Sequence, residues 1–109
     1  MLEPILGSTN AERTLMFIAM REEGYARDIA RHFDTDLYAI QKQLDKFEAG
    51  GILASRLVGR TRVYVFNLRY PFLNELKQLL QKAFSFYPQA EQDELIMKRQ
   101  RPRRRGKPL

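Results

Sequence analysis

The side chains of this chain that could do chemistry are hydrogen-bond donors and acceptors rather than nucleophiles or metal ligands. The sequence has no cysteine and a single histidine, His32, which excludes thiolate nucleophiles, disulfides and zinc–thiolate sites. It has no Gly-rich phosphate loop, and one histidine gives little basis for a Ser-His-Asp set. Glu22 and Glu23 lie at an expected helix end, where we expect solvated carboxylates. We therefore expect no enzymatic activity, no cofactor and no metal.

Side chains that could form hydrogen bonds with a binding partner lie on a helix that we expect over about residues 36–49. Apolar residues recur at three- and four-residue steps on both sides of the polar break Asp34-Thr35-Asp36, which is typical of two helical faces. These are Ile29, Ala30 and Phe33 before the break, and Ile40, Leu44 and Phe47 after it. Asp36 suits the N-cap of the second helix, and Gly50-Gly51 suits its end. The pattern predicts two helices joined by a short turn.

Burial of the apolar side of the second helix would leave four candidate contact residues on the other side: Leu37, Tyr38, Gln41 and Lys42. Gln41 can pair bidentately with adenine, and Lys42 can donate to guanine acceptors. Tyr38 can stack on a sugar, or contact a thymine methyl group or a phosphate. The alternative for each, given equal weight, is an ordinary solvated side chain, with Tyr38 covering the start of the helix.

A β-hairpin is expected over about residues 52–67. Two β-prone runs, 52–58 and 61–66, are joined at Gly59-Arg60. Candidate contacts to phosphates or to a minor groove lie on or near this hairpin and on the preceding helix: Arg27, Arg56, Arg60, Thr61 and Arg62. Any soluble hairpin also needs a charged tip. The signal therefore depends on the helical pair that precedes it, and together these elements predict a winged helix-turn-helix.

The overall charge of +6 comes from the C-terminus. Seven of the 19 basic residues and none of the 13 acidic ones lie within 98–109, which leaves 12 basic and 13 acidic residues in 1–97. The basic residues are Lys98, Arg99, Arg101, Arg103, Arg104, Arg105 and Lys107. We expect a disordered tail that makes nonspecific phosphate contacts. The alternative is a solubilising terminus.

Two further helices complete the expected fold. Thr9-Asn10-Ala11-Glu12 matches a capping box, so a first helix is expected from about Asn10 to Glu22, with Gly24 ending it. A C-terminal helix is expected over about 71–87, opened by Pro71. Its apolar residues cover more of its circumference than one packing face requires, which indicates a homodimer interface. The expected interface residues are Phe72, Leu73, Leu76, Leu80 and Phe84.

The predicted fold class is therefore mainly α with a small β-hairpin (α+β): a three-helix core, a wing and a C-terminal dimerisation helix. We expect one domain over 1–87, a short helix within 88–97 and the basic tail 98–109. No apolar run approaches the ~18 residues of a membrane span. There is also no signal sequence, so we expect a cytoplasmic, nucleoid-associated protein without a membrane partner.

Over roughly Ile5 to Phe86 the chain resembles the ArsR-like winged-helix transcriptional regulators. The segments that carry the resemblance are Leu6-Gly7-Ser8, Ala26-Arg27-Asp28-Ile29-Ala30, Ile40-Gln41-Lys42-Gln43-Leu44, Phe47-Glu48-Ala49-Gly50-Gly51-Ile52-Leu53, Val58-Gly59-Arg60-Thr61-Arg62-Val63-Tyr64 and 67–80. Metal-sensing members carry paired cysteines that are missing here, so a thiolate sensor is excluded. His32 would need carboxylates such as Asp28 or Asp34 to form a site, and a helix-surface histidine without a role is the favoured interpretation.

The resemblance implies a homodimer that binds double-stranded DNA, with repression as the simplest outcome. The sequence indicates no effector ligand, because no pocket-forming constellation stands out. Two other interpretations stay open, since a fold does not decide a function. One is a winged-helix module for protein interaction, using the apolar C-terminal helix. The other is a nonspecific nucleic-acid binder that acts through residues 98–109.

Overall fold

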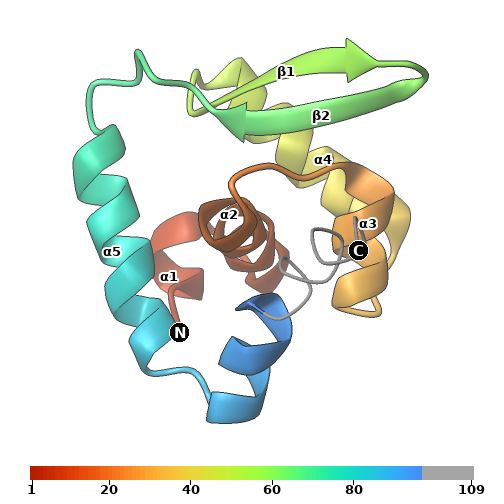
Figure 1. Cartoon of the computed structure of the whole chain (residues 1–109). Helices are drawn as coiled ribbons and strands as arrows, with labels where there is room; N and C mark the ends of the chain where they lie inside the picture. Colours follow the sequence, from red (N-terminus) through yellow and green to blue (C-terminus); the bar gives the residue numbers. More distant parts are fainter. Residues whose placement is uncertain (97–109) are drawn as a thin grey trace, which may run out of the picture.

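The computed structural model describes residues 1–96 and shows a mainly helical chain with one antiparallel β-hairpin (Figure 1). The elements are α1 (Glu3–Leu6), α2 (Thr9–Arg21), α3 (Ala26–His32), α4 (Leu37–Ala49), β1 (Leu53–Val58), β2 (Thr61–Phe66), α5 (Leu73–Ser85) and a helix over residues 89–96. This arrangement confirms the predicted α+β class. Within the described part, no helix is both long and apolar enough to cross a membrane.

The turn between α3 and α4 forms where the polar break predicts it. The Asp36 carboxylate accepts a hydrogen bond of 3.1 Å from the Ala39 backbone amide at the head of α4. Such a cap contributes about 1 kcal/mol and gives α4 a defined first residue. Asp34 has a φ of 51°, in the left-handed region that aspartate tolerates better than most residues. The chain thus turns sharply from one helix into the next.

The core forms around α2, which contributes the largest group of buried residues. The apolar faces of α3 and α4 pack into the same cluster, as the three- and four-residue steps predict. The cluster includes Leu15, Phe17, Ile18, Ile29, Ile40, Leu44, Phe47, Leu53, Tyr64, Leu80 and Leu95. Leu95 shows that the core extends beyond residue 87, the expected domain boundary, into the helix of residues 89–96.

The hairpin has the predicted two-residue turn. Val58 pairs with Thr61, so that Gly59 and Arg60 make the turn, and Gly59 has a φ of 64°. β2 has a second neighbour in Gly24, which exchanges backbone hydrogen bonds of 3.0 and 2.8 Å with Tyr64. A Cβ on Gly24 would lie 3.0 Å from the Phe17 ring, so a larger residue there would have to displace this ring slightly. Gly24 joins the hairpin to the helices and does not end α2, which corrects its predicted role.

The start of α2 also differs from the prediction. The N-cap is Ser8, whose hydroxyl accepts from the Ala11 amide at 3.0 Å, and Thr9 is already helical. Glu12 does not close a capping box, because its carboxylate accepts from the Leu2 amide at 2.7 Å, 10 residues away. The short helix α1, which was not predicted, brings Leu2 to this carboxylate.

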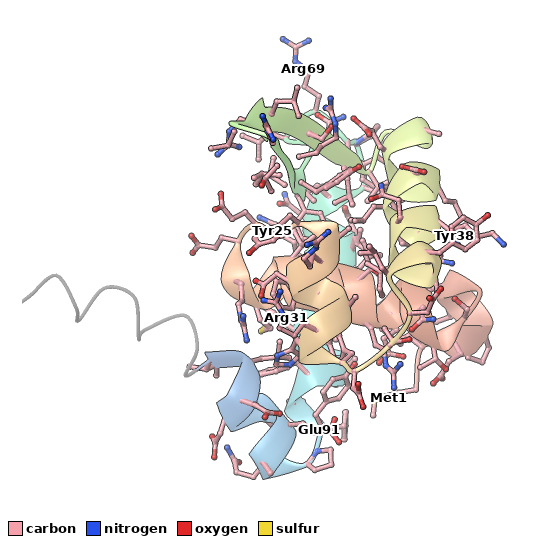
Figure 2. All side chains as sticks on the ribbon, turned by 90° about the vertical axis from the view of Figure 1, so that its right-hand side faces the viewer. Met1, Tyr25, Arg31, Tyr38, Arg69 and Glu91 are labelled. Atoms are coloured by element: carbon pink, nitrogen blue, oxygen red, sulfur yellow. The ribbon has the colours of Figure 1, made fainter. Side chains whose placement is uncertain are left out.

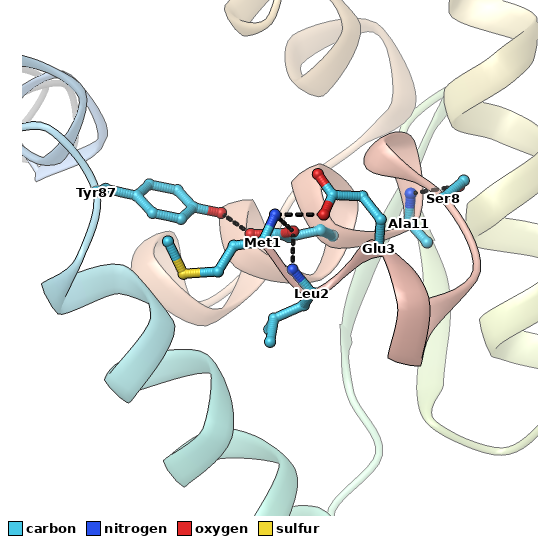
Figure 3. Close-up of polar contacts among 7 residues, drawn as sticks. Met1, Leu2, Glu3, Ser8, Ala11 and Tyr87 are labelled. Atoms are coloured by element: carbon cyan, nitrogen blue, oxygen red, sulfur yellow. Dashed lines mark hydrogen bonds and ion pairs between the residues drawn. The ribbon is translucent and has the colours of Figure 1, made fainter.

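Glu12 is the centre of a polar network at the N-terminal end of α2. Figure 3 shows Met1, Leu2 and Tyr87, which converge on it. Glu12 is nearly fully buried, and it accepts hydrogen bonds from the Tyr87 hydroxyl and from the Met1 amino group, the latter at 3.3 Å. Burial, together with the bond to Glu12, raises the pKa of Tyr87 well above its ordinary value. A buried carboxylate needs such partners to offset its desolvation. The network ties α1, α2 and the segment after α5 together.

α5 packs mainly on its own chain. Leu73 and Leu80 are only 7% and 0% exposed, and Leu76 and Phe84 are partly buried against the same core. Leu73 and Leu80 are therefore core residues and were wrongly assigned to a dimer interface, because almost none of their surface is left for a second chain. Phe72 is 62% exposed and remains available.

The helix of residues 89–96, expected within 88–97, is held at its end by Arg21. The Arg21 guanidinium donates to the Leu95 carbonyl at 3.0 Å. Leu95 is buried, whereas Ile96 is 42% exposed.

Candidate nucleic-acid interface

Several side chains in the N-terminal half of α4 are exposed to solvent and do not pack in the core. Ile40, Leu44 and Phe47 face the core, whereas Tyr38 is 71% exposed and Leu37 42% exposed. Lys42 is exposed as well. Figure 2 shows Tyr38 projecting outward from α4. Three of the four contact residues predicted for this helix are therefore available to a partner.

A groove lies between the first turn of α3, the exposed side of α4 and the turn of the hairpin. It has a volume of about 390 Å³, and of the described residues that line it three are arginines and none is acidic. The lining residues are Tyr25, Ala26, Arg27, Leu37, Gln41, Arg60, Thr61 and Arg62. Six of these were predicted as contacts on three separate elements, and the fold brings them together. The groove is suited to an anion such as a phosphate group.

Gln41 differs from its predicted state. Its side-chain amide donates to the Tyr64 hydroxyl at 3.1 Å and to the Asp45 carboxylate at 3.0 Å. Bidentate pairing with adenine needs this amide as a donor. Gln41 would have to give up one of these bonds, so it is not the freely projecting residue that helical spacing alone predicts.

Arg62 is likewise held by its own chain. Its guanidinium donates to the Ser55 hydroxyl at 3.0 Å, and Ser55 donates in turn to the Glu48 carboxylate at 2.6 Å. A guanidinium has five N–H donors, so Arg62 keeps most of its capacity for a ligand. The bond to Ser55 fixes where its charge lies relative to α4.

Arg56 is the predicted contact that the fold leaves outside the groove. It pairs across the strands with Val63 and forms an ion pair of 3.5 Å with Glu23, both side chains being more than half exposed. An exposed pair of this kind contributes at most about 1 kcal/mol. Arg56 could therefore contact a backbone phosphate only outside the groove.

Some residues of this region were not predicted. Tyr25 lines the groove, and Ser55, Glu48 and Tyr64 connect the hairpin to α4. A signal for the last three exists in the sequence. The two-residue turn fixes the strand register that pairs Ser55 with Tyr64, and Glu48 lies seven residues after Gln41, on the same side of the helix.

The remaining predictions concern the basic tail, a metal site and His32. The seven basic residues of 98–109 lie outside the described part of the chain. Within residues 1–96, no three His, Asp or Glu side chains gather closely enough to hold a metal ion. His32 is not a plain surface residue, because it is half-buried between the Phe17 and Phe33 rings and lies 3.2 Å from the Arg21 guanidinium.

A second hollow, of about 450 Å³, lies at the opposite end of α3 from the groove. It is lined by the start of α2, by His32 and Phe33, and by the helix of residues 89–96. Its described carboxylates include Glu12, Glu91 and Glu94, in contrast to the arginines of the groove. The sequence did not indicate this hollow, because it forms between segments that lie far apart along the chain.

No family model, curated protein or solved structure matches this chain.

Proposed function

We propose that this protein is a winged helix-turn-helix regulator that binds double-stranded DNA sequence-specifically and acts as a homodimeric repressor, like the ArsR-like family that its sequence resembles. The arginine-lined groove beside the exposed face of α4 is the observation that carries this proposal. Tyr38 and Lys42, the candidate base-reading side chains, are exposed on the same helix whose Leu37 and Gln41 line the groove beside the three arginines. A sequence-specific DNA-binding protein needs both kinds of contact.

In this proposal α4 enters the major groove of B-DNA. A helix with its side chains is about 10–12 Å wide, close to the ~12 Å width of that groove. Tyr38 and Lys42 would then meet base edges or the adjacent sugars, because they project from the leading half of the helix. Arg27, Arg60 and Arg62 would bind the flanking phosphates or reach the adjacent minor groove.

A homodimer would place two copies of α4 on one duplex. The exposed aromatic residues at the ends of α5, Phe72 and Phe86, are the apolar side chains there that the fold leaves uncovered. A two-fold symmetric pair would read an approximately palindromic site with half-sites about one helical turn apart. Occupying such a site would block polymerase access.

Selection of duplexes from a random pool tests this proposal. The full chain and a variant with the seven basic residues of 98–109 changed to glutamine are each selected, and then titrated with selected and scrambled duplexes at physiological salt. We expect both proteins to enrich one motif with two-fold symmetry and to bind it at least 10³-fold more tightly than scrambled DNA.

Two results of the selection would contradict the proposal. Binding that disappears in the glutamine variant and is indifferent to sequence would make the protein a nonspecific binder that acts through its tail. If neither protein binds any duplex, a protein-interaction module remains, and Phe72 and Phe86 would be the first surface to test.

A further inference from the structure

The hairpin is joined to α4 by side-chain hydrogen bonds at two points. Tyr64 and Ser55 are opposite each other on the paired strands, so their side chains lie on the same face of the hairpin. Gln41 and Glu48 are seven residues apart on α4, about two turns or 10.5 Å along its axis. Tyr64 binds Gln41 at 3.1 Å, and Ser55 binds Glu48 at 2.6 Å. We call these four residues the clasp.

The clasp lies near the middle of the hairpin, at the third of its six residue pairs counted from the open end, and not at its tip. Tyr64 is 2% exposed, and its backbone is paired on both sides, with Ser55 and with Gly24. Arg60 and Thr61, by contrast, are exposed at the turn. A two-stranded hairpin is marginal in water by itself. The direction in which its tip projects therefore depends on the contacts that hold the strands behind it, which are the clasp and the Gly24 backbone bonds.

We propose that Tyr64 and Ser55 are positioning residues for DNA recognition, because the clasp sets the angle between the hairpin and α4. This inference rests on the proposed function. α4 and the hairpin tip must reach one rigid duplex at the same time, and a displacement of about 1 Å in such an arrangement is enough to weaken a set of contacts. Tyr64 is too deeply buried to contact DNA, so its effect passes through the residues it positions.

The clasp also affects which side chains read bases. While Tyr64 and Asp45 hold the Gln41 amide, base reading belongs to Tyr38 and Lys42. Removing the Tyr64 hydroxyl releases one of the two bonds and gives Gln41 a donor for adenine. A variant that only lowers the stability of the fold would not change base preference. Base preference therefore distinguishes a positioning role of Tyr64 from a purely structural one.

The first arm of the test uses the free full-length protein. Backbone NMR relaxation is measured for the wild type, Tyr64→Phe, Ser55→Ala, the hydroxyl-retaining Ser55→Thr and the control Tyr70→Phe, whose ring lies outside the clasp. We expect order parameters near 0.85 for Arg60 and Thr61 in the wild type, Ser55→Thr and Tyr70→Phe. We expect values below about 0.6 in Tyr64→Phe and Ser55→Ala, with the helices unchanged. A hairpin equally rigid in all five proteins would overturn the inference.

The second arm measures affinity for the selected duplex in a double-mutant cycle. We expect Tyr64→Phe to weaken binding about three- to tenfold and to enrich adenine at one position when selection is repeated. In an Arg60→Ala background the same change should weaken binding by a smaller factor, because one of the contacts that the clasp positions is already absent. Fully additive losses with unchanged base preference would overturn the inference while leaving DNA binding intact. A wild type that binds no duplex would overturn the proposed function, and this inference with it.

Discussion

α4 and α5 are both amphipathic helices of 13 residues, yet they use their surfaces differently. α4 buries three residues and leaves Leu37 and Tyr38 in solvent at its start. α5 buries Leu73, Leu80 and Ala83 and packs further apolar residues partly against the core, so that its exposed aromatic residues lie at its ends. Figure 1 shows α5 running along the side of the helical group below the hairpin.

This difference separates two kinds of apolar residue that look alike in the sequence. On α5, apolar residues beyond the buried face are partly packed against the core of the same chain. The exposed Leu37 and Tyr38 of α4 are not packed in this way, and Leu37 lines the arginine-lined groove. Exposed apolar and aromatic residues beside a charged groove are therefore the better guide to a binding surface.

Exchanging one leucine for alanine on each helix gives the largest expected contrast. Leu80→Ala should lower the free energy of unfolding by about 3 kcal/mol, because it empties a fully buried site. Leu37→Ala should change it by less than about 0.5 kcal/mol, as expected for a surface position. Urea denaturation of both variants measures this. Similar losses would contradict the assignment of Leu80 to the core and of Leu37 to the surface.

The second prediction concerns the hydrogen bond between Tyr87, in the segment after α5, and Glu12. Tyr87→Phe should cost about 1–2 kcal/mol at neutral pH, because it leaves the buried Glu12 carboxylate short of a hydrogen bond. Folding raises the Tyr87 pKa, so the neutral hydroxyl is favoured in the native state. The contribution is fully present below the unfolded value of about 10 and is lost as pH rises above it. Denaturation of wild type and variant at pH 7 and above pH 10 measures both effects, and a gap that widens with pH would contradict them.

Matched substitutions on the two helices test which of them binds DNA. Tyr38→Ala and Lys42→Ala should each weaken binding to the selected duplex by about tenfold, within the range of a base contact. Gln78→Ala and Lys82→Ala, at exposed positions of α5, should change it less than twofold. Titration of each variant with the selected duplex at fixed salt measures these affinities. Equal losses of affinity from both pairs would contradict the proposal that α4 is the DNA-binding face.

The groove arginines should act on all duplexes alike. Arg60→Ala together with Arg62→Ala is expected to weaken selected and scrambled DNA by similar factors. It should also reduce the slope of log affinity against log salt by about 1 for each phosphate that is no longer bound. Lys82→Ala, which removes a positive charge at an exposed position of α5, is the control and should leave the slope unchanged. A weakening confined to the selected duplex would make the arginines base readers.

The smallest effect on folding is expected at the ends of α5. Phe72→Ser with Phe86→Ser should change the free energy of unfolding by less than about 0.5 kcal/mol, because both rings are more than 60% exposed. The same pair should shift sedimentation from dimer to monomer. An unchanged dimer would place the interface elsewhere on the chain.

Local patterns predicted much of the fold. The apolar steps around Asp34-Thr35-Asp36, the Asp36 cap and the turn at Gly59-Arg60 depend on neighbours within a few residues, and the structure confirms them. The Glu12 network could not be predicted, because it joins a side chain to Leu2 and Tyr87, 10 and 75 residues away. Once Glu12 has those partners, the capping role that its spacing suggests is lost.

The sequence identified which residues belong to the candidate site better than it predicted what those residues contact. Arg27, Arg60 and Arg62 were each identified, but their common groove follows from how the hairpin packs on the helices. Gln41 was expected to project freely because helical spacing ignores the hairpin that lies beside it. Leu80 was assigned to an interface for the corresponding reason, since a wheel of apolar positions does not say which surface covers them.

The most direct test is an NMR titration of the full-length protein with the selected duplex. The account predicts that amide shifts concentrate on Leu37–Lys42 and on residues 59–62, while the exposed face of α5 hardly changes. Shifts centred on α5, or confined to residues 98–109, would contradict the claim that α4 and the hairpin form the DNA-binding surface.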